Sequence, residues 1–376
     1  MKIIADDKIP FLRNVLEPFA EMIYLPFTQI TKNTIKNADA LIIRTRTKCD
    51  ENLLSGNNIK LIATATIGYD HIDTNYCNAN NISWINAPGS NSSSVKQYIA
   101  AALLYFAEKR NIKLEEVSIG IVGVGNVGSK VAEVSKILDL RTLLNDPPRE
   151  RSEGKQNFIS LEQLIEESKI ITFHVPLSFT GQDKTFHLAD KNFFNKFSEP
   201  KTIFNSSRGE VIHTNALIDA INLSKVYFSA LDVWEGEPNV NQQLLNLTNI
   251  ATPHIAGYSV EGKANATAHC VNEINKYFNL GLSPNWYPSK LPDPYQSKMV
   301  KIDCAGKSKQ DVITKIIMHT YDILKDDGQL RKKSNNFEML RSEYYVRREF
   351  DFYEVQLIHP NKSIEESLVN LGFKLI

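Results

Sequence analysis

The chain has 376 residues, of which 42% are hydrophobic and 23% charged, and its 43 basic and 43 acidic side chains balance to zero. This length predicts two or three domains with a core that needs no disulfide or metal. A net charge of zero gives no whole-chain electrostatic case for nucleic acid or an anionic membrane, so we expect neither as a partner.

The cysteines and the N-terminus indicate the compartment. The four cysteines lie far apart in the sequence, without the spacing of a zinc site. The first residues reach Asp6 and Asp7 without an apolar signal segment, and no run approaches 18 apolar residues. We therefore expect a reduced, cytoplasmic protein that holds no metal.

Short apolar runs alternate with longer polar stretches in the first ninety residues. The polar stretches are long enough for helical crossovers, and the rhythm predicts a parallel sheet with helices on both faces. An antiparallel α+β domain is the alternative. The expected strands are residues 2–5, 22–25, 40–43, 61–65 and 82–85.

A turn-rich break at residues 88–94 precedes an Ala-rich helix predicted over residues 95–110, and the break marks a domain junction. From residue 117 the alternation of strand and helix restarts, which predicts a second doubly wound unit of about 140 residues. Its expected strands are residues 118–122, 141–145, 169–174, 202–205, 227–232 and 250–252, with helices that include 161–167 and 214–221.

The last part of the chain has a different pattern. A long amphipathic helix over residues 260–278 is followed by a proline-rich linker at residues 283–294. Beyond the linker we expect a small α+β domain. Its elements are a strand at 299–304, a helix at 309–324, a strand at 351–358 and a short helix at 365–371.

A glycine-rich loop follows the predicted strand at 118–122. Gly123 permits a tight turn, Gly125 lets the backbone approach a pyrophosphate, and Gly128 lets helix and strand pack closely. The helix begins at about Asn126 and Val127, and its free N–H groups favour phosphate. Glycines that serve only the packing are the alternative.

The acid that closes the next strand indicates which dinucleotide binds. Asp146 lies 18 residues after Gly128, near the separation of about 20 residues typical of an acid that binds the ribose hydroxyls. A carboxylate there repels a 2′-phosphate, so the sequence favours NAD over NADP. Arg149 lies close by and could bind the 2′-phosphate of NADP, which is a feature in favour of NADP.

Three polar residues stand at predicted strand exits in the second unit, namely Arg208, Glu237 and His254. Ligands bind outside these carboxyl ends of parallel strands. An imidazole can take a hydroxyl proton, a neighbouring carboxylate can orient the ring, and a guanidinium can fork onto a substrate carboxylate. The set predicts oxidation of an alcohol next to a carboxylate.

Four motifs, taken in order, resemble the D-isomer-specific 2-hydroxyacid dehydrogenase family: residues 123–128 with Asp146, then 205–209, 231–238 and 252–257. The resemblance covers about residues 35–280. It implies catalysis by Arg208, Glu237 and His254. It adds cofactor contacts at Val175, Ser206, Asp232 and Gly257, and a substrate loop at Thr66, Ile67 and Gly68.

We therefore expect an α/β fold with two doubly wound parallel-sheet domains, a Rossmann-type cofactor domain and a flavodoxin-like substrate domain, plus the small α+β C-terminal domain. A hinge between the first two would let a cleft close over the substrate. The expected boundaries are residues 1–93 with 258–285 for the substrate domain, 94–257 for the cofactor domain and 286–376 for the C-terminal domain.

Further details are similar to a branch of this family that acts on a phosphorylated acid. They are a cation- and hydroxyl-rich strand exit with Arg44, Thr45 and Arg46, then Tyr258, and the additional C-terminal domain. That branch usually carries Ser where this chain has Thr45. On a continuous strand Arg44 and Arg46 would point to one face of the sheet and Thr45 to the other. All three side chains can therefore bind one ligand only if the strand ends before them. A solvated basic edge is the alternative.

The resemblance to this branch implies NAD-dependent oxidation of 4-phospho-D-erythronate at C2, giving 2-oxo-3-hydroxy-4-phosphobutanoate, in the biosynthesis of pyridoxal 5′-phosphate. It also implies a homodimer joined through residues 286–376. Two alternatives stay open. One is a 3-phosphoglycerate or hydroxypyruvate dehydrogenase with a regulatory tail, and the other is an NAD-sensing binding protein on the same fold.

Overall fold

The structure is a computed structural model that describes residues 1–376. The chain divides into two compact units, each built from two segments. Unit 1 comprises Met1–Asn91 and Ser259–Pro292, and unit 2 comprises Ser92–Tyr258 and Asp293–Ile376. No helix in either unit combines the length and apolar content that spanning a membrane requires. The division into three domains stays a prediction.

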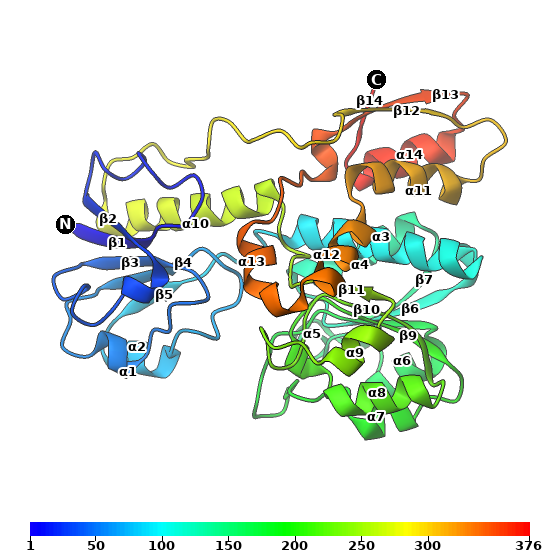
Figure 1. Ribbon diagram of the computed structural model, residues 1–376, viewed down its shortest axis with the longest axis horizontal. Helices are drawn as coiled ribbons and strands as arrows, with labels where there is room; N and C mark the ends of the chain where they lie inside the picture. Colours follow the sequence, from blue (N-terminus) through cyan, green and yellow to red (C-terminus); the bar gives the residue numbers. More distant parts are fainter. The chain divides into compact units, whose positions relative to one another are not determined.

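Unit 1 is built on a five-stranded sheet in the order β2-β1-β3-β4-β5, and every strand pairs in parallel (Figure 1). The antiparallel alternative is therefore wrong, and the order is that of flavodoxin-like folds. The strands are β1 Lys2–Asp6, β2 Glu21–Leu25, β3 Ala40–Ile43, β4 Leu61–Thr64 and β5 Ser83–Ile85.

Helices cover both faces of this sheet, although fewer than the sequence predicts. The long helix α10, Val260–Phe278, packs Cys270, Val271 and Ile274 into an apolar cluster with one face (Figure 1). The short helices α1, Glu51–Leu54, and α2, Thr74–Ala79, serve the other face.

Helical crossovers are absent from the first two connections of unit 1, where we expected them. Both connections are made of turns, with a single 3₁₀ turn at Phe27–Gln29. Pro10, Pro18 and Pro26 interrupt these segments, and proline removes a helical hydrogen bond and clashes with the preceding turn.

Unit 2 holds a six-stranded parallel sheet in the order β7-β6-β8-β9-β10-β11. The buried helix α3, Ser92–Arg110, belongs to its larger apolar cluster. The strands are β6 Ser118–Val122, β7 Arg141–Asn145, β8 Ile170–Phe173, β9 Lys201–Asn205, β10 Val226–Leu231 and β11 Ile250–Ala251. The helices between them are α4 Asn126–Ile137, α5 Pro147–Glu153, α6 Leu161–Glu167, α7 Lys191–Asn195, α8 Thr214–Asn222 and α9 Gln242–Leu247.

The C-terminal part of unit 2 adds a three-stranded parallel sheet, β12-β13-β14, with α11 and α14 on one side (Figure 1). Its apolar residues join the cluster of α3. The elements are β12 Met299–Asp303, α11 Lys309–Thr320, α12 Ile323–Lys332, α13 Phe337–Ser342, β13 Glu354–Ile358, α14 Lys362–Leu371 and β14 Lys374–Leu375.

Two predicted boundaries in this region are wrong. The helix expected to run to residue 324 ends at Thr320, because Tyr321 adopts an extended backbone (φ −152°, ψ 106°) and Asp322 caps a new helix. The strand expected from residue 351 begins at Glu354, because Phe350–Phe352 form a 3₁₀ turn. The helices α12 and α13 were not predicted.

Candidate active site

The glycine-rich loop of unit 2 leaves open space where a dinucleotide phosphate would approach. Gly123 has φ +86°, and a Cβ on it would lie 2.7 Å from the carbonyl oxygen of His174 and from Val175 Cγ1. A Cβ on Gly128 would lie 2.0 Å from the Gly123 carbonyl oxygen, whereas one on Gly125 would meet nothing within 4 Å. The loop sits at the β6/β8 switch point, so these residues fit NAD.

Asp146 stands at the end of β7 and holds this loop. Its Oδ2 accepts the Val124 N–H at 2.7 Å and its Oδ1 accepts the Arg149 N–H at 3.0 Å. The Arg149 guanidinium pairs with both carboxylate oxygens of Glu153 at 2.7 Å. The cation that could receive a 2′-phosphate is therefore already occupied, while each Asp146 oxygen keeps a lone pair for a ribose hydroxyl.

The turn that carries Arg208 is held by the last residue of β9. Asn205 Oδ1 accepts the N–H of Ser207 at 3.0 Å and its hydroxyl at 2.8 Å, and Asn205 Nδ2 donates to the Arg208 carbonyl at 2.9 Å. Arg208 itself is half-buried, and its Nη1 donates to the Ser207 carbonyl at 2.8 Å. Hydrogen bonds from both its backbone and its side chains thus fix this turn.

Glu237 and His254 form the acid–imidazole pair expected from the sequence. Glu237 Oε2 lies 2.7 Å from His254 Nδ1, and Oε1 accepts the Trp234 N–H at 2.9 Å. Burial raises the pKa of Glu237, but the His254 ring and these hydrogen bonds outweigh burial and lower that pKa below its ordinary value. Glu237 is therefore ionised, and Nε2 is the His254 nitrogen left for proton transfer.

Asp232 organises the loop that carries His254. Its main-chain oxygen accepts the His254 N–H at 2.7 Å. Its carboxylate accepts the Ile255 and Ala256 N–H groups, both at 2.8 Å, and the Thr252 hydroxyl at 2.6 Å. His254 has φ +56°, a left-handed conformation that a non-glycine residue keeps only when its surroundings enforce it. Asp232 supplies part of that enforcement, and its expected contact with the cofactor stays a prediction.

Sequence reasoning missed the packing role of Gly209, which follows Arg208. A Cβ on Gly209 would lie 2.0 Å from the Trp234 carbonyl carbon and 2.3 Å from the Glu235 nitrogen. The turn of Arg208 therefore lies directly against the loop that carries Glu237. The glycine was visible in the motif, but only the packed backbone reveals that its missing side chain matters.

His174 lies between two hydroxyl groups near the cofactor loop. Its ring nitrogens lie 2.9 Å from Thr172 Oγ1 and 3.4 Å from Ser206 Oγ. Burial lowers the pKa of His174 from 6.5 to about 3, so the ring is neutral at physiological pH. This environment indicates a structural role for His174, which places the predicted cofactor residue Ser206 beside a neutral ring.

The candidate substrate residues of the strand exit lie in unit 1. β3 ends at Ile43, and the Thr47 N–H donates to the Arg44 carbonyl at 3.1 Å in a turn. The strand has therefore ended before Thr45 and Arg46. Strand alternation does not force Thr45 away from Arg44 and Arg46, so the three side chains can meet one ligand. Arg44 Nη2 lies 3.0 Å from Asp6 Oδ1 at the β1/β3 switch point, while Arg46 is exposed.

The second substrate loop follows β4. Thr66 Oγ1 donates to the Gly68 carbonyl at 2.8 Å and lies 2.7 Å from Thr64 Oγ1. His71 Nε2 lies 3.0 Å from the same Thr64 hydroxyl, and Asn86 Nδ2 donates to the Ile67 carbonyl at 2.6 Å. The loop thus has a defined shape before any substrate arrives.

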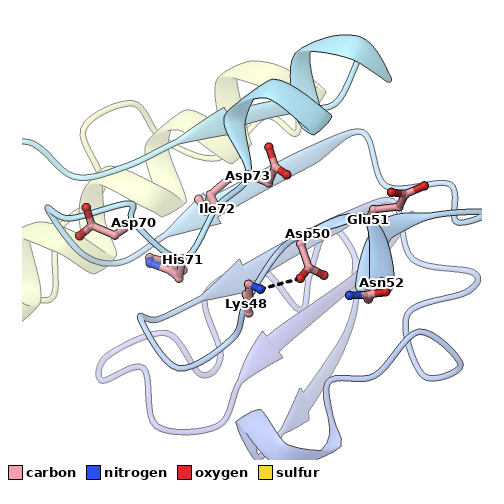
Figure 2. Close-up of a pocket in the computed structure, with 8 residues that line it drawn as sticks. All are labelled: Lys48, Asp50, Glu51, Asn52, Asp70, His71, Ile72 and Asp73. Atoms are coloured by element: carbon pink, nitrogen blue, oxygen red, sulfur yellow. Dashed lines mark ion pairs between the residues drawn. The ribbon is translucent and has the colours of Figure 1, made fainter. Parts of the chain in front are cut away.

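A hollow of about 330 Å³ lies beside this loop (Figure 2). Asp50 and Asp73 cap α1 and α2, and Lys48 pairs with Asp50 at 3.0 Å. This surplus of carboxylates disfavours an anion, so we do not assign the phosphate here. Its lining residues are Lys48, Asp50, Glu51, Asn52, Asp70, His71, Ile72 and Asp73.

The predicted site residues lie in both units of the chain. Arg208, Glu237, His254, Tyr258 and the cofactor candidates all belong to unit 2, whereas the Arg44–Arg46 and Thr66–Gly68 segments belong to unit 1. Glu237 and His254 are in direct contact. The His, Cys, Asp and Glu side chains form no group of three or more suited to a metal ion.

Comparison with known proteins identifies the family. Residues 99–256 match the family described as D-isomer specific 2-hydroxyacid dehydrogenase, NAD binding domain, and residues 295–372 match a domain of unknown function, DUF3410. An erythronate-4-phosphate dehydrogenase from Bacteroides thetaiotaomicron is 48% identical over 94% of this chain and 99% of its own. The chain belongs to the erythronate-4-phosphate dehydrogenase family.

Further relatives agree with this membership. The erythronate-4-phosphate dehydrogenase of Proteus mirabilis is 37% identical over 99% of both chains. The crystal structure of D-lactate dehydrogenase from Aquifex aeolicus with NAD and lactic acid has a TM-score of 0.64 at 24% identity, covering 74% of this chain and 96% of that one. The α/β fold, the family resemblance and NAD as cofactor are thus confirmed for this erythronate-4-phosphate dehydrogenase family member.

Proposed function

We propose that the chain oxidises C2 of 4-phospho-D-erythronate with NAD, giving 2-oxo-3-hydroxy-4-phosphobutanoate for the synthesis of pyridoxal 5′-phosphate. The 2.7 Å pair of Glu237 and His254 is the observation that carries this proposal, because it is a base held ready for a hydroxyl proton. The name of the 48% identical relative supplies the substrate.

The chemistry divides among three side chains. His254 Nε2 takes the proton of the C2 hydroxyl, and the ionised Glu237 stabilises the resulting imidazolium through Nδ1. Arg208 forks onto the C1 carboxylate and polarises the C2 oxygen. Bound NAD supplies the acceptor for the hydride that leaves C2. One proton and one hydride thus leave the substrate, and a ketone remains.

The cations of unit 1 distinguish this substrate from an unphosphorylated acid. We infer that Arg44 and Arg46 bind the 4-phosphate, with hydroxyls from Thr45, Thr66 and Tyr258. The turn after β3 supports this assignment, since it frees consecutive side chains from strand alternation. Ile67 and Gly68 would present backbone groups to the carboxylate.

We also infer a homodimer that works in the cytoplasm. The C-terminal segment carries exposed apolar side chains at Tyr295, Met299 and Ile376, which are 99%, 51% and 60% exposed. The family resemblance supports a contact between two copies through this segment, and these side chains are accessible to it. The four cysteines are free thiols, as a reducing compartment would keep them. Light scattering of the purified protein tests the dimer.

A substrate panel tests the proposed function. Initial rates of NADH formation are compared for 4-phosphoerythronate, 3-phosphoglycerate, glycerate and lactate, each with NAD and with NADP. We expect the highest kcat/KM for 4-phosphoerythronate with NAD. Preference for 3-phosphoglycerate would favour the alternative dehydrogenase, and preference for an unphosphorylated acid would contradict the phosphate assignment.

A further inference from the structure

Two buried residues of opposite charge, Asp232 and Arg347, hold the backbone of the two residues that follow His254. The Ile255 and Ala256 N–H groups donate to the Asp232 carboxylate, as described above. On the carbonyl side, Arg347 Nη2 donates to the Ala256 oxygen at 2.6 Å and to the Ile255 oxygen at 3.2 Å. The loop is therefore fixed from both sides, immediately after the catalytic histidine.

Arg347 comes from the C-terminal segment and is buried beside aromatic rings. It is 1% exposed, and its guanidinium carbon lies 4.5 Å from the centre of the Tyr321 ring. The Tyr321 and Tyr344 hydroxyls donate to Asp326 Oδ2 at 3.0 and 2.7 Å, and Arg347 Nη1 lies 3.4 Å from the Tyr344 hydroxyl. Burial raises the pKa of Asp326 to about 6, so above that pH its carboxylate is a buried negative charge near the guanidinium.

A buried guanidinium is costly where its donors lack partners. The partners of Arg347 Nη2 are carbonyls of the catalytic loop, whereas the buried Nε has no partner, so the loop carbonyls are the main backbone acceptors that hold this charge. The loop also carries a cost of its own, because His254 is in the left-handed region at φ +56°. Such a conformation persists only where several contacts over-determine it. Arg347 supplies contacts from outside the 99–256 dehydrogenase domain.

We propose that Arg347 is a positioning residue for the oxidation, acting through the Ile255–Ala256 peptide to fix His254 in contact with Glu237. The same segment touches the next residues of the loop, since the Tyr344 ring lies 5.8 Å from the Tyr258 ring. The C-terminal domain of unknown function thereby gains a role in the chemistry. The test of this role by kcat rests on the proposed function, since it measures the turnover of 4-phosphoerythronate.

The test compares Arg347→Lys with a matched control, Arg331→Lys. Arg331 also comes from the C-terminal segment and also donates to two carbonyls, Leu245 at 2.8 Å and Thr248 at 2.6 Å, but these belong to α9 and its C-cap. A lysine ammonium is a compact charge and cannot reproduce the planar fork. The readouts are kcat and KM for 4-phosphoerythronate, the Kd for NAD and the Tm.

We expect Arg347→Lys to lower kcat by about 10- to 100-fold, because a displacement near 1 Å of a catalytic group has this effect. The Kd for NAD and the KM for 4-phosphoerythronate should each change by less than about threefold, because the substitution displaces the base and leaves the binding groups in place. Arg331→Lys should lower Tm to a similar extent, with kcat within about twofold of wild type. Equal kcat for both variants would overturn the proposal.

Two further measurements keep the test decisive. If Arg347→Lys does not fold, Tyr344→Phe removes the hydroxyl beside the guanidinium and should lower kcat by about threefold or more; an unchanged kcat overturns the proposal. If the wild type oxidises no acid of the panel, the proposed function fails, and the NMR chemical shifts of the His254 ring nitrogens at one fixed pH replace turnover. Ring shifts that change in Arg347→Lys but not in Arg331→Lys support positioning, and unchanged ring shifts in Arg347→Lys refute it.

Discussion

Replacing Gly209 with alanine is a direct test of how Arg208 is placed relative to Glu237. The added Cβ would lie 2.0 Å from the Trp234 carbonyl carbon, whereas ordinary contact begins at 3.4 Å, so the two loops must separate by about 1.4 Å. Overpacking of this kind costs about 1–3 kcal/mol of folding free energy. A shift of about 1 Å between catalytic groups lowers turnover roughly 100-fold.

The assay pairs steady-state kinetics with thermal unfolding. We expect Gly209→Ala to lower kcat about 100-fold while the Kd for NAD changes little, because the glycine-rich loop lies elsewhere in the sheet. Gly328→Ala is the matched control: Gly328 lies within helix α12 and its Cβ would meet nothing within 4 Å. The free energy of unfolding of that variant should rise by about 0.5–1 kcal/mol, because alanine is favoured over glycine inside a helix. Wild-type kcat in Gly209→Ala would refute the reasoning.

Three more predictions concern single side chains. His254→Asn should lower turnover by roughly 10²–10⁴-fold while NAD binding, followed by fluorescence, persists; unchanged turnover would remove His254 as the base. Asp146→Ala should raise the Kd for NAD more than that for NADP, and equal losses would exclude the ribose role. His174 has a folded pKa of about 3, below the ordinary 6.5, so its contribution to stability is present above pH 6.5 and is lost as the pH falls toward 3. Denaturant titrations at pH 7.5 and at pH 5 should show that the free energy of unfolding falls by ~1–2 kcal/mol between them, a value reduced because His174 is partly accessible. His174→Asn should not show this fall, and an equal fall in that variant would contradict the prediction.

The parallel sheets were predictable because their strands are buried on both faces and appear as short continuous apolar runs. β3, for example, is ALII and wholly buried. The helices α12 and α13 were not predictable in the same way. The stretch from Asp326 to Asn336 is polar and includes Gly328, so its helices depend on tertiary contacts, such as Leu330 and Phe337 in an apolar cluster of unit 2.

The residues of the site also differ in whether the sequence could predict them. Arg208, Glu237 and His254 were predictable from polar residues at strand ends within motifs, because parallel strands bring their carboxyl ends to one edge. Arg347 was not predictable, since its partners are backbone carbonyls about 90 residues earlier, and such contacts leave no spacing in the sequence. The packing role of Gly209 depends on backbone proximity, which the sequence does not encode locally either.

The position of α10 has a consequence for synthesis on the ribosome. The strands of unit 1 are complete at Ile85, but the helix that covers one face begins at Val260, roughly 175 residues later. At 5–20 residues per second, the face that includes Ile3 and Ile42 stays uncovered for about 9–35 s before α10 begins to be synthesised. During that interval the nascent chain exposes an apolar surface, so chaperone binding to this segment should depend on translation speed.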